Sequence, residues 1–192
     1  MLPVTNPSSV RSIMLDAEQQ LIRKAQRGEA ESFGALYDHY LPKIYRYILA
    51  KVNHRQVCED IAHEVFLRAW KNIGEFQERG FPFSSWLYRI ARNQVIDHYR
   101  LQKNTVSLDR IDSDLVRFTD SPETAADVRI AWEKVRSVMR HLTEDEQDVI
   151  VMRFVSDLAP KEIAEVLGKS EGAVRVIQHR AIQALKELMK EA

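Results

Sequence analysis

The chain has 192 residues, of which 45% are hydrophobic and 29% charged, with few glycines and prolines, so we expect a globular and helix-rich protein. Its 28 basic and 28 acidic residues cancel, so any nucleic-acid surface must come from local segregation of charge. The single cysteine, Cys58, excludes an internal disulfide and a multi-cysteine zinc site. It agrees with a reducing, cytoplasmic location. We see neither a secretory signal nor an apolar run long enough to span a bilayer, so no membrane contact is expected.

The first half of the chain predicts several helices in residues 15–103, after a flexible tail at residues 1–14. Asp16 is a suitable cap for a first helix that stops at Gly28. A third helix is expected from Asp60 to Phe76, and a fourth from Trp86 to about Lys103. The second helix is marked by apolar residues at helical spacing, namely Phe33, Leu36, Tyr37, Tyr40, Ile44, Tyr45 and Ile48.

The expected third helix has an apolar stripe and a charged face. Leu67 lies among the charged residues, and an apolar residue ringed by charges can be an interface anchor. A single exposed leucine is also commonplace. The stripe consists of Ile61, Val65, Ala69 and Ile73, widened by Phe66 and Trp70, and the charged face of Asp60, Glu64, Arg68 and Lys71.

The segment Phe81-Pro-Phe-Ser-Ser-Trp-Leu-Tyr-Arg-Ile-Ala-Arg-Asn places aromatic residues beside basic ones, which is typical of surfaces that stack unpaired bases. The alternative is that Phe81, Phe83 and Trp86 pack the domain. Four basic residues, Arg89, Arg92, Arg100 and Lys103, face only Asp97 as counter-charge. On the following helix, Arg89, Asn93, Ile96 and Arg100 share one face with Trp86, whereas Leu87, Ala91, Val95 and Tyr99 share a face that should be core.

Residues 104–122 lack sustained periodicity and hold more aspartates than arginines, which indicates an acidic linker between two helical domains. An ordered acidic loop packed on one domain is the alternative. The second domain, residues 123–192, should begin with helices from Glu123 to His141 and from Glu144 to Phe154. Thr143 and Glu146 have the spacing of a capping box at the start of the latter.

The next two helices form a helix-turn-helix pattern, with a turn at Gly168 and a cap at Ser170. The final helix should bury Val174, Ile177, Ala181, Ala184, Leu185 and Leu188 and expose Arg175, Val176, His179, Gln183 and Lys186, with Arg180 on the flank. Arginine and glutamine can read base edges in the major groove. An ordinary solvated helix face is the alternative.

Catalysis is poorly supported. The six histidines are scattered, and no metalloprotease, P-loop or nucleophile-elbow motif occurs. We therefore expect neither an enzyme nor a bound metal or cofactor.

Four motifs, in order, resemble the extracytoplasmic-function sigma factors of bacterial RNA polymerase. They are Asp60-Ile-Ala-His-Glu-Val-Phe-Leu-Arg-Ala-Trp, Phe83-Ser-Ser-Trp-Leu-Tyr-Arg-Ile-Ala-Arg-Asn, Leu142-Thr-Glu-Asp-Glu-Gln and Glu162-Ile-Ala-Glu-Val-Leu-Gly. The resemblance implies an all-α fold of two small helical domains, sigma region 2 and sigma region 4, joined by the acidic linker. A free-standing helix-turn-helix regulator is the alternative.

The resemblance also implies roles. Core polymerase should bind through its β′ clamp helices and its β flap. The β′ clamp helices should contact Asp60, Glu64, Leu67, Arg68 and Lys71. In the promoter, the −10 element should meet the loop from Gln77 to Ser85 and the following helix, at Phe81, Phe83, Ser84, Ser85, Trp86, Arg89, Asn93 and Arg100. The −35 element should meet Ser170, Ala173, Arg175, Val176, His179, Arg180 and Gln183.

The chain departs from the family at the final helix. Many members have Ser-Arg where this chain has Val176 and Ile177, so the resemblance carries over no particular −35 sequence. No further domain follows Ala192 in this sequence, so regulation is expected from a separate anti-sigma factor.

Overall fold

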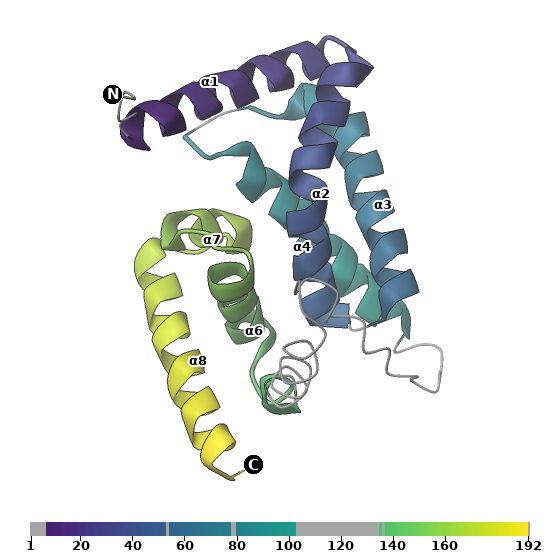
Figure 1. Cartoon of the computed structure of the whole chain (residues 1–192). Coiled ribbons are helices and arrows are strands. Elements are labelled where there is room, and N and C mark those ends of the chain that lie inside the picture. The colour runs from purple at the N-terminus through teal and green to yellow at the C-terminus, as the bar shows by residue number, and fades with distance from the viewer. Residues whose placement is uncertain (1–6, 53, 78–79, 103–134, 136, 192) are drawn as a thin grey trace, which may run out of the picture.

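The computed structural model describes residues 7–52, 54–77, 80–102, 135 and 137–191, with the backbone alone at residues 7–16, 102 and 191. Helices and no strand occur in these ranges, so the expected all-α fold class is confirmed (Figure 1). The elements are α1 (Pro7–Gln26), α2 (Ala30–Val52), α3 (Arg55–Asn72), η1 (Ile73–Glu75), α4 (Phe83–Gln102), α6 (Glu144–Ile150), the π-helical segment η3 (Val151–Val155), α7 (Pro160–Leu167) and α8 (Glu171–Glu191).

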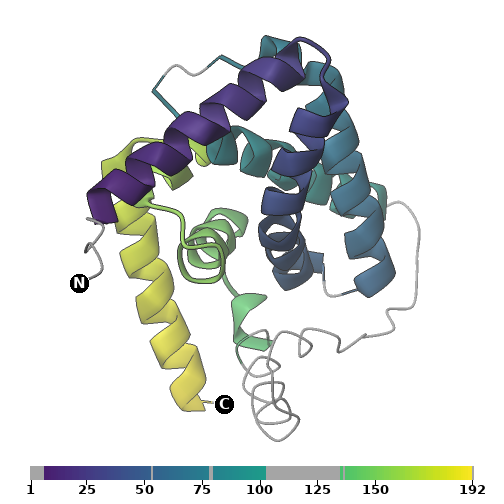
Figure 2. The same ribbon diagram turned by 45° about the horizontal axis from the view of Figure 1, so that its top comes forward.

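In the N-terminal unit, α2, α3 and α4 pack together, and α1 crosses one end of them (Figures 1 and 2). The expected tail was placed wrongly at residues 7–14, because α1 already begins at Pro7 and Asp16 lies inside it. Proline suits the first turn of a helix, since it lacks an N–H that would have no partner there. The predicted stop is confirmed: Gly28 has φ +90° and its N–H donates to the Ala25 carbonyl at 2.9 Å.

Helix α3 begins at Arg55, five residues before the expected start, because His54 supplies the N-cap. The His54 ring nitrogen Nδ1 accepts the Val57 N–H at 3.5 Å. The helix ends at Asn72, and the 3₁₀ turn η1 follows, so the expected helix from Asp60 to Phe76 is in fact two elements. The expected apolar stripe is confirmed, since Ile61, Val65, Ala69 and Ile73 are all buried.

Helix α4 buries Leu87, Ala91 and Val95 as expected. Tyr99 was wrongly assigned to the same core face, because 40% of it is exposed. Its hydroxyl donates to the Lys51 carbonyl at 2.6 Å, at the end of α2, so the ring extends along the surface.

In the C-terminal unit, α6, α7 and α8 each begin with a capping hydrogen bond. Thr143 and Glu146 form the predicted capping box of α6. Ala159 caps α7 without a side chain, but its N–H donates to the Glu162 carboxylate at 2.7 Å. Gly168, at φ +62°, ends α7, and Ser170 Oγ accepts the Ala173 N–H at 3.1 Å to begin α8.

This geometry confirms the predicted helix-turn-helix. The linker at residues 104–122 and most of the helix expected from Glu123 to His141 lie outside the described residues. The described part of that helix, residue 135 and residues 137–139, is helical.

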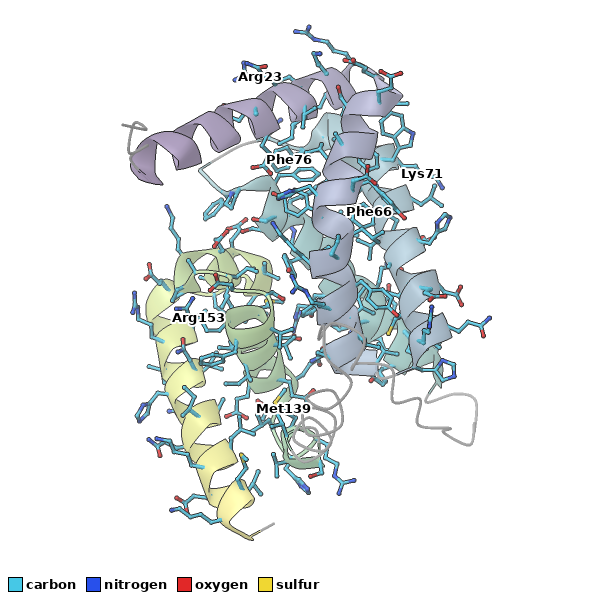
Figure 3. All side chains as sticks on the ribbon, in the orientation of Figure 1. Arg23, Phe66, Lys71, Phe76, Met139 and Arg153 are labelled. Carbon is cyan, nitrogen blue, oxygen red and sulfur yellow. The ribbon has the colours of Figure 1, made fainter. Side chains whose placement is uncertain are left out.

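The two units share a buried core, and side chains fill the space between them (Figure 3). The shared cluster includes Ile44 and Leu87 from the N-terminal unit and Val149, Met152 and Ile163 from the C-terminal unit. A smaller cluster of Leu142, Ile150 and Ala181 lies within the C-terminal unit. Within the described ranges, no helix combines the length and apolar character needed to cross a membrane.

Candidate nucleic-acid and polymerase interfaces

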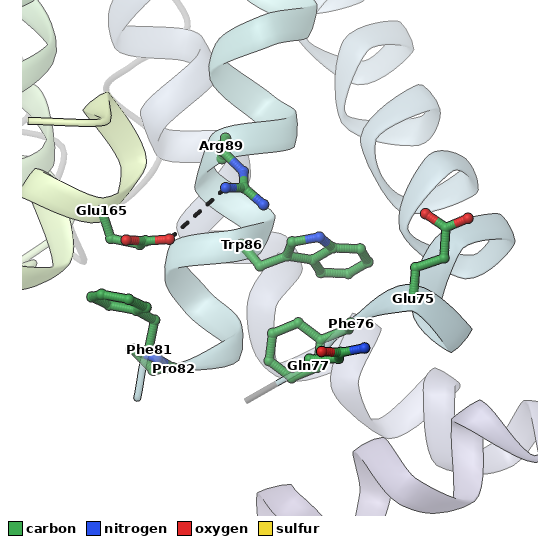
Figure 4. A pocket seen from close by; sticks show the side chains of 8 residues that line it. All are labelled: Glu75, Phe76, Gln77, Phe81, Pro82, Trp86, Arg89 and Glu165. Carbon is green, nitrogen blue, oxygen red and sulfur yellow. Dashed lines mark ion pairs between the residues drawn. The ribbon is translucent and has the colours of Figure 1, made fainter. Parts of the chain in front are cut away.

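An open cavity of about 390 Å³ lies at the start of α4 (Figure 4). Phe81 and Trp86, both partly exposed, lie beside the exposed guanidinium of Arg89. Aromatic rings next to a cation suit the stacking of an unpaired base and the holding of its backbone. The remaining lining residues are Glu75, Phe76, Gln77, Pro82 and Glu165.

Phe83 and Ser85 do not face this cavity. They are 2% and 1% exposed, so their predicted contact with DNA is incompatible with this arrangement. The Phe83 ring lies 5.6, 5.3 and 5.4 Å, between centroids, from the rings of Tyr40, Phe76 and Trp86. Phe83 therefore packs the domain, which is the alternative that the sequence analysis gave for it. In this position its ring supports the wall of the cavity.

The exposed face of α4 is as expected, because Arg89, Asn93 and Arg100 are all exposed along it. Arg92 belongs to the same basic stretch of sequence, but it is only partly exposed. It turns toward the C-terminal unit, where its Nε lies 2.7 Å from Asp148 Oδ2. Burial opposes the charge of Arg92, but the hydrogen bond and the charge of Asp148 together raise its pKa.

Asp148 is the centre of a cluster that the sequence did not reveal. Its side chain is 1% exposed, and Oδ1 accepts from Lys51 Nζ at 2.8 Å and from the Tyr47 hydroxyl at 3.1 Å. Burial, and then the negative charge of Asp148, raise the pKa of Tyr47 well above its ordinary value. Tyr47 and Arg92 are 101 and 56 residues away in sequence, so no local pattern marks the cluster. The only local sign of a buried charge is that Asp148 directly precedes the apolar residues Val149 and Ile150.

Helix α8 presents the predicted faces. Val174 and Ala181 are fully buried, and Ile177, Ala184, Leu185 and Leu188 are partly buried. Near the N-terminus of the helix, Arg175 Nη2 lies 2.6 Å from Glu171 Oε1 in an exposed pair that is weak in water. The predicted −35 residues Ser170, Arg175, Val176, His179, Arg180 and Gln183 are exposed, and Ala173 is partly exposed.

The charged face of α3 is likewise open to solvent. Leu67 is 37% exposed, and Arg68 and Glu64 form an ion pair of 2.7 Å beside it. The hydrogen bond from Arg68 lowers the pKa of Glu64. Asp60, Arg68 and Lys71 are exposed and Glu64 is partly exposed, so the predicted set forms one surface.

Two family descriptions match the chain in the order of its two units. Residues 36–105 match Sigma-70 region 2, and residues 138–187 match Sigma-70 region 4. The ECF RNA polymerase sigma factor SigW of Bacillus subtilis is 30% identical over 179 residues, which cover 88% of this chain and 95% of SigW. The ECF sigma factor BldN of Streptomyces coelicolor is 36% identical over 175 residues, which cover 90% of this chain but 66% of BldN.

Solved structures share the fold. CnrH, in complex with the cytosolic domain of CnrY, superposes with a TM-score of 0.72 at 24% identity, covering 91% of this chain and 98% of CnrH. The sigma factor RpoE of Bartonella quintana, in complex with the anti-sigma factor NepR, gives a TM-score of 0.67 at 17% identity, covering 83% of this chain and 98% of RpoE.

A free-standing regulator is not favoured by these matches, because region 2 accompanies region 4 along the chain. Sigma factors are in general subunits that recognise DNA rather than enzymes. The described residues hold no group of three or more histidine, cysteine, aspartate or glutamate side chains suited to a metal ion. The chain therefore belongs to the extracytoplasmic-function sigma factors of the sigma-70 family, the promoter-specificity subunits of RNA polymerase.

Proposed function

We propose that this sigma factor reads the −10 element with α4 and its cavity and the −35 element with α8, and binds core polymerase through α3, with no catalysis of its own. The observation that supports this proposal most directly is that α4 and α8 each have one apolar and one polar face. Each helix buries its apolar face and leaves basic and amide side chains exposed. These exposed faces are the ones that the family uses for DNA.

For the −10 element, we propose that an unstacked base enters the cavity beside Phe81 and Trp86. Removing a base from a duplex costs a few kcal/mol, which stacking and fixed placement must offset. Arg89, Asn93 and Arg100 continue from the cavity along α4 and suit contacts with the adjoining backbone. Phe83 and Ser85 support this site from the core without touching DNA.

Trp86→Ala should leave holoenzyme assembly unchanged but impair promoter opening about tenfold, since stacking on one aromatic ring contributes roughly 1–3 kcal/mol. Permanganate reactivity of unpaired thymines measures opening, and core-binding titration measures assembly. Trp86→Phe keeps a stacking ring and should retain most of the opening. Opening by the alanine variant at the wild-type rate would remove Trp86 from the DNA site.

For the −35 element, we propose that the N-terminal turns of α8 enter the major groove. Arg175 and Val176 are exposed there, and Val176 can contact a thymine methyl group. Arg175 must leave Glu171 to do so, which costs little because both side chains are exposed. Ser170 and Ala173 lie at the helix start, whose free N–H groups suit a phosphate.

Arg175→Ala should change the preference among −35 sequences, whereas Arg180→Ala should weaken binding evenly. Arg175 lies where base edges are reached, and a lost base contact costs roughly 1–3 kcal/mol at one position. Arg180 lies on the flank, where a phosphate contact mainly affects the salt dependence. Holoenzyme binding to a panel of −35 variants at several salt concentrations separates the two. Equal, sequence-independent losses in both variants would contradict the assignment.

For core polymerase, we propose that the α3 face of Asp60, Glu64, Leu67, Arg68 and Lys71 contacts the β′ clamp helices, and that region 4 contacts the β flap. An apolar residue within a charged rim is the usual composition of a protein interface. Leu67, at 37% exposure between charged neighbours, supplies that apolar centre.

We also propose that a separate anti-sigma factor regulates this chain. RpoE, which shares the fold, was solved in complex with the anti-sigma factor NepR. Tagged chain purified from its own cells should bring down such a protein, and that protein, when added to core enzyme and the chain, should abolish transcription. A captured protein without effect on transcription would not be the regulator.

A further inference from the structure

Gln94 is a buried polar residue on the side of α4 that meets α3. It is 8% exposed, and its neighbours Ala91 and Val95 on α4 are buried as well. Burying a carboxamide costs free energy unless its polar atoms have hydrogen-bond partners. The partner of Gln94 is a residue of the proposed polymerase surface, namely Arg68 on α3.

The contact between the two side chains involves two donors of the guanidinium. The carboxamide oxygen of Gln94 accepts from Arg68 Nη1 at 2.7 Å and from Arg68 Nε at 3.2 Å. The amide has this orientation because a guanidinium carries donors only, so the oxygen must face it. Arg68 Nε also lies 2.7 Å from Glu64 Oε1. Within the described residues these contacts use Nε and Nη1, which leaves Nη2 available.

The guanidinium of Arg68 lies in an open groove of about 450 Å³ between α3 and α4. The Arg68 side chain is 48% exposed, so it faces solvent although one of its partners is buried. Leu67, the apolar centre of the proposed polymerase surface, directly precedes it in the sequence. A partner protein that covers Leu67 therefore meets a guanidinium whose position is already fixed.

Of the two residues that hold Arg68, Gln94 is the one that can fix it. The pair with Glu64 joins two exposed side chains one turn apart on a helix, and such pairs are weak in water. Gln94 is instead held in place by the core around it. A side chain that is ordered before binding loses less conformational entropy when the partner arrives.

We propose that Gln94 is a positioning residue for the binding of core polymerase. By fixing the Arg68 guanidinium, it directs Nη2 toward an acceptor oxygen of the polymerase. Helix α4 then contributes to both functions, with Arg89 and Asn93 on its exposed face for DNA and Gln94 on its buried face for polymerase. The inference rests on the polymerase role proposed for α3.

A double-mutant cycle between Gln94 and Arg68 tests the proposal in the full chain. Gln94→Met keeps nearly the same shape and removes the acceptor, and an apolar side chain suits a buried position. Arg68→Ala removes the group that is positioned. Titration of labelled chain with core enzyme gives Kd for the wild type, both single variants and the double variant. Gln20→Met makes the same change at an exposed position on α1 and is the control.

We expect Gln94→Met to raise Kd about fivefold, because Arg68 must then be ordered on binding. Arg68→Ala should raise Kd about tenfold, through loss of the contact itself. The double variant should stay within about twofold of Arg68→Ala, since Gln94 acts only through the arginine. Gln20→Met should change Kd by less than about twofold, as a surface substitution outside the interface.

Mobility of Arg68 in the free chain gives a readout that does not involve polymerase. Nuclear magnetic relaxation of the Arg68 Nε–H group, identified by its absence in Arg68→Ala, reports this mobility. We expect a rigid group in the wild type and a flexible one, with an order parameter below about 0.6, in Gln94→Met. The wild-type measurement applies even if the substitution lowers stability, and Gln94→Leu offers a second, shorter apolar side chain.

Three results would each overturn the positioning role: a wild-type Kd for Gln94→Met, losses that multiply in the double variant, or a flexible Arg68 in the wild type. Leu67→Asp separates this failure from failure of the polymerase role. If Leu67→Asp weakens core binding and Gln94→Met does not, the positioning role alone is wrong. If neither weakens it, the α3 face is not the polymerase surface.

Discussion

Phe83→Ala is expected to lower the free energy of unfolding by about 3–5 kcal/mol, the usual loss when a buried phenylalanine is truncated. The side chain is 2% exposed and its ring packs against those of Tyr40, Phe76 and Trp86. The alanine variant leaves a cavity at the junction of α2, η1 and α4, which cannot collapse without moving these elements. Urea or thermal unfolding followed by circular dichroism measures the change.

Phe154→Ala is the matched control, because Phe154 is 60% exposed and its truncation should change stability by about 0.5 kcal/mol or less. Phe83→Leu should lose less than Phe83→Ala, since it keeps most of the buried volume. An alanine variant of wild-type stability that fails to open promoters would contradict the packing role and restore Phe83 to the DNA surface.

Leu67→Asp is expected to weaken binding to core polymerase about 30-fold or more without unfolding the chain. Truncation of a buried interface anchor costs roughly 2 kcal/mol or more, and a carboxylate adds the cost of a buried charge. The measurement is a titration of labelled sigma factor with core enzyme. Leu67 is exposed in the free chain, so the thermal midpoint should stay near that of the wild type.

Met189→Asp provides the control for Leu67→Asp, because it places the same charge at an exposed apolar position on α8, in the other unit. Leu67→Met should bind core enzyme normally. If Leu67→Asp and Met189→Asp have the same affinity as wild type, the α3 face is not the polymerase surface.

The sequence predicted local structure correctly where that structure depends on residues close together in the chain. Periodicity predicted the buried stripe of α3 and both faces of α8, and the residue types at Thr143, Gly168 and Ser170 predicted the boundaries of the C-terminal helices. The starts of α1 and α3 were placed too late. Proline at the first position of α1 presets the helical backbone without the polar residue that the sequence analysis looked for, and His54 is an unusual cap that propensity does not favour.

Features that depend on contacts between residues far apart in the sequence could not be predicted from it. Nothing near Arg92 distinguishes it from Arg89, yet Arg92 pairs with Asp148 while Arg89 stays at the surface. Similarly, Phe81 and Phe83 are two residues apart in sequence, but only Phe83 is buried against the rings of Tyr40 on α2 and of Phe76, which directly follows η1. Tyr99 continues the helical spacing of the buried residues Leu87, Ala91 and Val95, but it lies beyond the end of the core. The spacing alone therefore predicted wrongly that Tyr99 is buried.

Transcription in vitro on fragmented genomic DNA from the source organism, with core polymerase and mapped 5′ ends, tests the central claim most directly. We predict that the chain is required for initiation at a limited set of sites, and that these sites share one sequence about 10 and another about 35 base pairs upstream. No chain-dependent initiation, combined with tight sequence-specific binding of the free chain to duplex DNA, would contradict the account and indicate a free-standing regulator.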